Sequence, residues 1–197
     1  MKARKLKNVC LSYLCALQDT HIQLAKDQFE NPECGSDELI ALKILCESEE
    51  ERKGALATYF ERWKEEPIGV DQWMEMQVQI DDPEAIAMAK KIVTSESFSY
   101  EVPSRAFSVI RGLIQNGAYF HSQEGYEFIA DEILRIENET LAILLMKSAF
   151  RDLPNLEARL QDHIKTQLQK IDNSHSGEAV RQYAQKMLRE NFPEEKK

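Results

Sequence analysis

The side chains best suited to chemistry are four histidines: His21, His121, His163 and His175. No two of them lie three to five residues apart, and none belongs to an HExxH motif, the spacing that sets two imidazoles on one helix face around zinc. Phosphate-binding glycine loops and the GxSxG nucleophile motif are also missing from the sequence. The sequence therefore predicts no catalytic residue, no metal site and no cofactor site in this chain.

A few single residues allow a functional interpretation beside a structural one. His121 stands at a tight turn next to an aromatic residue. It could be a ligand or a general base, but the favoured interpretation is that it caps the turn. Asp71 lies between the two tryptophans, and we expect it to form a fold-specifying ion pair with Arg62 or Lys64 rather than to act as an active carboxylate. Arg105 could face a ligand cavity, with a solvated or salt-bridged arginine as the default.

The four cysteines form no CxxC pair and no Cys/His cluster with zinc-finger spacing. Cys10 and Cys46 fall on apolar helical faces, where a free thiol packs as a small hydrophobic group. We interpret the cysteines as reduced and buried, which indicates a cytoplasmic protein. A disulfide framework is the less favoured alternative for a chain of this length.

The composition is that of an ordinary globular protein, with 43% hydrophobic and 30% charged residues among 197. The net charge of −9 argues against a generic nucleic-acid-binding surface. The first 17 residues imitate a signal peptide, but their apolar run is short and lacks the small residues of a cleavage site. No segment approaches the roughly 18 apolar residues of a membrane span. We expect neither nucleic acid nor membrane as a partner.

The elements that position these residues are all predicted to be helices. The sequence has only 7 Gly and 6 Pro and no stretch of regular strand alternation. Apolar spacing and capping signals place the helices at about 2–17, 20–30, 36–46, 48–65, 67–77, 83–93, 103–115, 128–136, 138–150, 154–171 and 177–191. The predicted fold class is all-α, an irregular right-handed superhelix of antiparallel helix pairs of the HEAT or armadillo kind, with about eleven helices. We expect a single helical domain over residues 1–197, with the polar linker 94–101 as the best place for a bend.

The stretch 59–73 holds both tryptophans and the joint between two helices. Pro67 biases its predecessor away from the helical region but fits the first turn of the next helix. Trp63 and Trp73 therefore lie on opposite sides of a corner, where we expect both indoles to be largely buried.

Five stretches of this sequence resemble motifs of a known family: 7–14 (KNVCLSYL), 36–42 (SDELIAL), 60–67 (FERWKEEP) with 70–73 (VDQW), 102–105 (VPSR), and 120–122 (FHS) with 125–128 (GYEF). In this order they are similar to the C-terminal helical domain of bacterial aminopeptidase N, a zinc metallopeptidase of the M1 family. The tryptophan-containing stretch is the most specific match. The last forty or so residues match only in helical character.

The resemblance implies a non-catalytic domain that closes the substrate chamber of a peptidase and controls access to it. In the family, HExxH and the other zinc ligands belong to earlier domains, so this chain alone should bind no zinc and should be inactive. The implied partners are the catalytic domain of the same polypeptide, which holds the zinc, and peptide substrates. The alternative is a free-standing helical-repeat protein that binds a peptide or protein partner.

The resemblance also implies four substrate-chamber candidates. Arg105 matches a family arginine, whereas Phe107, Thr140 and Leu144 stand where the family has polar chamber-facing residues. We expect the helix over 102–114 to form the inner face. Because Arg105 and Phe107 are two residues apart, one should face the cavity and the other the helix packing. A structural role for Arg105, paired with Glu101 or Glu127, is the alternative.

Overall fold

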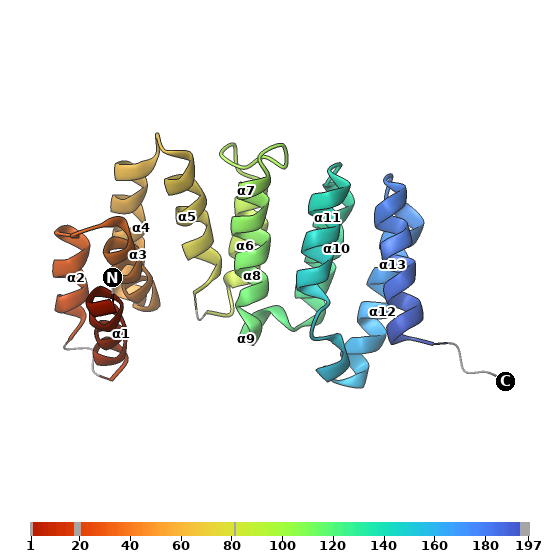
Figure 1. The fold of residues 1–197 in the computed structure, drawn as a ribbon, viewed down its shortest axis with the longest axis horizontal. Helices are drawn as coiled ribbons and strands as arrows, with labels where there is room; N and C mark the ends of the chain where they lie inside the picture. The colour runs from red at the N-terminus through yellow and green to blue at the C-terminus, as the bar shows by residue number, and fades with distance from the viewer. Residues whose placement is uncertain (1, 18–20, 81, 194–197) are drawn as a thin grey trace. The chain divides into compact units, whose positions relative to one another are not determined.

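The computed structural model describes residues 2–17, 21–80 and 82–193, and every regular element within these ranges is helical. The chain divides into two compact units, residues 1–80 and 81–197. The described part of the first unit holds α1 (Lys2–Leu17), α2 (Ile22–Glu30), α3 (Gly35–Glu47), α4 (Glu49–Trp63) and α5 (Pro67–Val78) (Figure 1). Consecutive helices pack against each other, and α3 also contacts α1 and α5.

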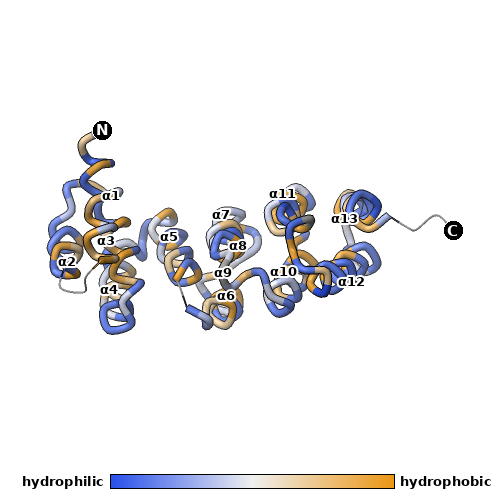
Figure 2. Tube along the Cα trace, turned by 90° about the horizontal axis from the view of Figure 1, so that it is seen from below, coloured by the Kyte–Doolittle hydropathy of each residue, from blue (hydrophilic) through white to orange (hydrophobic). Residues whose placement is uncertain are grey.

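The core of the first unit is built from one side of each helix. Figure 2 shows hydrophobic and hydrophilic stretches alternating along these helices, as expected for amphipathic helices that are partly buried. The buried apolar residues include Ala25, Phe29, Leu42, Leu45, Tyr59, Val70, Met74 and Val78. Burying this apolar surface supplies most of the free energy that holds the unit together.

A polar network fixes α1 and α2 to the start of α3. The buried carboxylate of Asp37 accepts hydrogen bonds from Lys7 Nζ at 2.7 Å and from Asn8 Nδ2 at 2.9 Å. Gln28 of α2 donates to the backbone carbonyl of Asp37 at 2.8 Å. The hydrogen bond from Lys7 lowers the pKa of the Asp37 carboxyl below its ordinary value, and the bond from Asn8 adds to this effect.

The corner between α4 and α5 forms as the sequence predicts. Pro67 occupies the first turn of α5. Both indoles are partly buried, and the Trp63 N–H donates to Glu38 Oε2 at 3.1 Å while the Trp73 N–H donates to the Leu56 carbonyl at 3.1 Å. Each tryptophan thus ties its helix to a neighbour through its polar edge as well as its ring.

The ion pair expected between Asp71 and Arg62 or Lys64 is wrong, because both bases bind other acids. Arg62 Nη1 lies 2.8 Å from Glu38 Oε1, and Lys64 Nζ lies 2.7 Å from Glu61 Oε2. The structure favours Glu38 because that carboxylate is buried at the helix interface, where a charged partner stabilises it most.

The described part of the second unit begins with α6 (Ala85–Val93). A continuous helical stretch follows: α7 (Pro103–Ala106), the π-helical turn η2 (Phe107–Arg111) and α8 (Gly112–Gln115). Then come the single turn α9 (Gly117–Phe120), α10 (Gln123–Arg135), α11 (Glu139–Ala149), the 3₁₀ turn η3 (Leu153–Asn155), α12 (Ala158–Ser174) and α13 (Glu178–Asn191). Within this unit α10 packs against α12, and α12 packs against α13. The largest fully buried side chains include Ile110, Leu113, Phe120, Tyr126, Ile129, Leu145 and Met146.

The predicted elements agree with the structure in type and differ at some ends. With 103–115 taken as one helix and the single turn α9 set aside, the described residues hold the eleven helices that the sequence predicts. The connector expected up to Tyr126 ends earlier, because Ser122 caps α10 by accepting a hydrogen bond from the Gly125 amide at 3.1 Å. The helix expected from Pro154 begins only at Ala158, after η3. The bend at 94–101 remains a prediction.

The cysteines only partly match their predicted environments. Cys46 is buried, and this burial raises the pKa of its thiol to about 12. Cys10 is exposed, so its predicted burial is wrong. The reason is that α1 packs through Asn8 and Leu11, which are buried, and leaves the side that carries Cys10 in solvent.

Candidate functional site

Arg105 lies in α7 and turns its guanidinium toward the preceding loop. Its Nη1 donates a hydrogen bond to the backbone carbonyl of Ser97 at 2.5 Å. The side chain is half-buried rather than free in solvent. Arg105 therefore fixes the segment 94–101, which connects α6 to α7.

Phe107 is the first residue of the π-helical turn η2 and is half-buried. A π turn contains one more residue than an α turn, and such turns are frequent at functional sites. The sequence analysis missed this irregularity, because the apolar spacing of 103–115 fits an ordinary α-helix. Ala106 and Val109, on either side of Phe107, are fully buried, so the stretch is anchored in the core.

Thr140 and Leu144 lie one turn apart on α11. Thr140 is exposed, and 44% of Leu144 is accessible to solvent. The same helix packs against η2, the turn that carries Phe107. The structure thus brings the elements bearing Phe107, Thr140 and Leu144 side by side, whereas the guanidinium of Arg105 bonds to the 94–101 segment.

A groove of about 510 Å³ lies beside that segment, within the second unit. Its walls come from the 94–101 segment, the start of α7, and the residues between α10 and α11. Phe98 and Tyr100 form part of the wall and contact each other edge to face, with ring centroids 4.9 Å apart. The opposite wall includes Arg135, Glu137 and Asn138.

The polar groups of this groove were not identified from the sequence. The phenol oxygen of Tyr100 is buried, and no hydrogen-bond partner for it is found within the described residues. Arg135 bonds through Nη1 to Glu132 Oε1 at 3.0 Å. Burial raises the pKa of the Glu132 carboxyl, and the charge of Arg135 partly opposes this shift. One feature of the sequence could have indicated this groove: the aromatic residues Phe98 and Tyr100 interrupt an otherwise polar linker.

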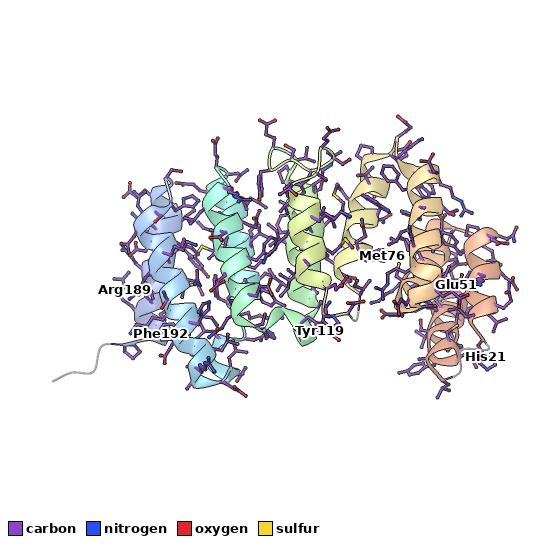
Figure 3. The ribbon with its side chains drawn as sticks, turned by 180° about the vertical axis from the view of Figure 1, so that it is seen from behind. His21, Glu51, Met76, Tyr119, Arg189 and Phe192 are labelled. Atoms are coloured by element: carbon purple, nitrogen blue, oxygen red, sulfur yellow. The ribbon has the colours of Figure 1, made fainter. Side chains whose placement is uncertain are left out.

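His121 has the structural setting that the sequence favours. Its Nδ1 lies 2.9 Å from the hydroxyl of Tyr126, and its ring packs beside Phe120 with centroids 5.2 Å apart. Tyr126 is fully buried, and this burial raises the pKa of its phenol. The pair closes the turn between α9 and α10; α9 is the short helix that carries Tyr119, labelled in Figure 3.

The residues that the structure describes do not gather into a metal site. No three His, Cys, Asp or Glu side chains among them lie where they could hold one ion. A zinc ion therefore does not fit the described part of this chain. None of the described helices combines the length and the apolar character needed to cross a bilayer.

Comparison with known proteins relates this architecture to one family. Residues 1–189 match the family described as "Domain of unknown function (DUF3458_C) ARM repeats". The aminopeptidase N of Caulobacter vibrioides is 30% identical over 89 residues, which make up 44% of this chain and 10% of that protein. The crystal structure of Legionella pneumophila aminopeptidase A in complex with aspartic acid has a TM-score of 0.87 and 30% identity, over 95% of this chain and 23% of that one.

These matches confirm two predictions from the sequence. The fold is all-α and of the armadillo-repeat kind. The resemblance to the C-terminal helical domain of bacterial aminopeptidase N is confirmed by both relatives. The chain spans about a tenth of the curated relative and about a quarter of the solved one.

Proposed function

Because this chain belongs to the DUF3458_C family of ARM-repeat domains, the C-terminal helical domain of aminopeptidase N-like proteins, we propose that it serves a zinc aminopeptidase as its non-catalytic part. In this proposal the catalytic domain lies on the same polypeptide and holds the zinc ion. That domain removes N-terminal residues from peptides, while the helical domain closes the substrate chamber and controls access. The proposal rests chiefly on the family match, which runs over residues 1–189.

The chamber-facing surface in this proposal consists of Phe107, Thr140 and Leu144. They come from two elements in contact, η2 and α11, and all three keep part of their surface in solvent. Arg105 acts indirectly in this proposal. Its hydrogen bond to the Ser97 carbonyl holds the 94–101 segment in place, and that segment forms one wall of the groove. A wall of this kind selects peptides by size and by contacts remote from the cleaved bond.

The working enzyme is proposed to be cytoplasmic. All four cysteines are free thiols, which supports a reducing compartment, because disulfides form and persist in oxidising ones. The net charge of −9 supports partners other than nucleic acid.

The first experiment is to sequence the DNA upstream of Met1 and to express the whole reading frame. We expect an in-frame upstream region that encodes HExxH, and a zinc-dependent aminopeptidase activity that the 197-residue chain lacks. Peptides beginning with alanine and with aspartate should both be assayed, because the solved relative is described with aspartic acid bound. A ribosome-binding site directly before Met1 would contradict the proposal and favour a free-standing repeat protein.

Access control is tested separately by adding a bulky side chain to the proposed chamber wall in the longer polypeptide, which leaves less space for the substrate. Thr140→Trp adds bulk at an exposed position of α11, so cleavage of decapeptides should fall more than cleavage of dipeptides. Gln185→Trp, at an exposed position of α13, is the matched control and should change neither rate. Equal effects of Thr140→Trp on both substrate lengths would remove α11 from the chamber wall.

A further inference from the structure

The groove beside the 94–101 segment has a wall that internal hydrogen bonds hold in place. The Glu101 amide donates to the Ser99 hydroxyl at 3.2 Å. The Arg105 guanidinium ties the segment to α7 through the Ser97 carbonyl. Figure 1 shows this segment and the connection between α10 and α11 at the same end of the second unit. Because the wall is already ordered, a ligand that fits the groove loses little free energy in shaping it.

The same wall offers two aromatic rings to the groove. Phe98 and Tyr100 both line it and keep part of their surface in solvent. Their rings meet edge to face, with centroids 4.9 Å apart and planes at 88°. The phenol oxygen of Tyr100 is buried, so the ring rather than the hydroxyl is what this side chain presents. The face of an aromatic ring carries partial negative charge and attracts cations.

No cation of the protein itself covers these two rings within the part of the chain that the structure describes. The first unit shows the opposite case, since the Arg62 guanidinium lies over the Phe29 ring, 4.9 Å from its centroid. Such a contact stabilises a ring and a charge together. At Phe98 and Tyr100 the cation therefore has to come from a ligand.

The charged groups of the lining favour a positively charged ligand. They are Arg135, Glu101 and Glu137. The Arg135 guanidinium is already paired with the buried Glu132 carboxyl, at 3.0 Å between Nη1 and Oε1. Glu101 and Glu137 are exposed, and neither forms an ion pair with another described residue. Two unpaired carboxylates thus remain, in a chain whose net charge is −9, and their field attracts cations.

We propose that this groove binds a linear polyamine, a ligand with two or more ammonium groups joined by methylene chains. One ammonium group pairs with Glu101 on the 94–101 segment, and another pairs with Glu137 between α10 and α11. The methylene chain lies against the two rings and against Val93 and Pro103, the apolar residues of the lining. A single basic side chain would supply one ammonium group and leave the second carboxylate unpaired. Such a site is independent of the proposed function, because its residues all lie in the second unit of this chain.

The polyamine site is tested by titrating the 197-residue chain with spermidine and following its backbone amides by NMR. Saturable shifts are expected for the amides of 98–101 and 135–138, which belong to the two walls of the groove. Butylamine has one ammonium group and should bind more weakly by about twofold to fivefold, as expected for the loss of one exposed ion pair. The neutral 1,4-butanediol should cause no shift, and added salt should weaken spermidine binding.

Substitutions of the carboxylates separate a built site from general attraction to an acidic protein. Glu101→Gln and Glu137→Gln should each weaken spermidine binding by about twofold to fivefold. Glu96→Gln is the matched control, because it removes the same charge from an exposed position of the same segment outside the lining. It should leave the affinity unchanged.

The aromatic pair is tested in the same way. Phe98→Leu removes a ring but keeps an apolar side chain, so spermidine binding should weaken by about twofold to fivefold. Tyr100→Phe keeps the ring and should leave the affinity unchanged. Circular dichroism reports whether Phe98→Leu stays folded, and the variants of the exposed Glu101 and Glu137 decide the question if it does not.

Four results would overturn the polyamine site. The first is shifts with spermidine that do not saturate or that fall outside the groove. The second is an equal loss of affinity in Glu96→Gln and Glu101→Gln, which would make the binding diffuse attraction to the acidic surface. The third is butylamine binding as tightly as spermidine, which would make a single ammonium group, such as that of a lysine side chain, sufficient. The fourth is shifts of the same amides with hexanoate instead of spermidine, which would make the ligand an anion bound by Arg135.

Discussion

Gly69 lies directly against Trp63 across the α4–α5 corner. A Cβ atom at position 69 would stand 2.4 Å from Trp63 Cβ and 3.0 Å from its carbonyl oxygen. The Trp63 carbonyl oxygen belongs to the backbone, and Trp63 Cβ is bonded directly to it. Neither atom can move unless the helix shifts. The corner therefore depends on a residue without a side chain, two positions after Pro67.

Gly69→Ala should destabilise the first unit by about 1–3 kcal/mol, because the added methyl group forces α4 and α5 apart. Urea denaturation followed by tryptophan fluorescence measures this change in the free energy of unfolding. Gly54→Ala is the control: Gly54 lies within α4 with nothing within 4 Å of its added Cβ. There alanine should stabilise the helix by about 0.5–1 kcal/mol. A neutral Gly69→Ala would show that the corner adapts freely.

Asp37 should make the stability of the first unit sensitive to acid. The hydrogen bond from Lys7 lowers the pKa of this carboxyl in the folded state. Its contribution is therefore complete above the unfolded value of about 3.9 and is lost as the pH falls through the lower folded pKa. Asp37→Asn should reduce stability at neutral pH and flatten the loss of stability below about pH 4. Thermal melts at several pH values test this, with exposed Asp27→Asn as the control that keeps the acid response.

Glu132 should have the opposite pH dependence, because burial raises the pKa of its carboxyl. The folded protein favours the protonated form, so stability is highest below the ordinary pKa of about 4.3 and declines as the pH rises through the folded value. Glu132→Gln keeps an acceptor for Arg135 and removes the buried charge. It should raise the free energy of unfolding at pH 8 by about 1 kcal/mol and remove this decline. A variant less stable than the wild type at pH 8 would mean that the ion pair with Arg135 outweighs the burial.

Arg105 should affect peptide binding in the longer enzyme rather than the chemical step. Arg105→Ala removes the donor to Ser97 and releases the segment beside the groove, so KM for long peptides should rise about 3–10-fold with little change in kcat. Arg105→Lys, which keeps a donor, should restore part of the affinity. Arg111→Ala, an exposed arginine of η2, is the control on the same helical stretch. An unchanged KM across peptide lengths would exclude Arg105 from the site.

Helix positions could be predicted because their signals are local. Pro67 and Asn138 begin helices through the geometry of their own residues, and the structure places them at the predicted starts of α5 and α11. The irregular turns were missed for the opposite reason. The turns η2 and η3 depend on how their backbones fit neighbouring helices, and apolar spacing alone does not record that fit.

The candidate site was predictable in part only. The resemblance named Phe107 and Leu144 as candidates, and the contact between their elements, η2 and α11, is known only from the structure. The sequence also did not indicate that Arg105 would bond to Ser97. Cys10 illustrates the limit most clearly. Periodicity identified the apolar side of α1 correctly, yet the burial inferred from it was wrong within this chain, since periodicity does not say which molecule covers a face.

The turn η2 also bears on insertions and deletions. A π turn accommodates one extra residue without breaking the helix on either side. Deleting a single residue from 107–111 should therefore restore an uninterrupted α-helix instead of unfolding the stretch. If α8 keeps its buried Leu113 in place, the deletion would rotate Arg105 about the helix axis by about 100°, one residue's share of a turn at 3.6 residues per turn. Relatives of different length at this point can thus aim the same arginine in different directions while sharing one core.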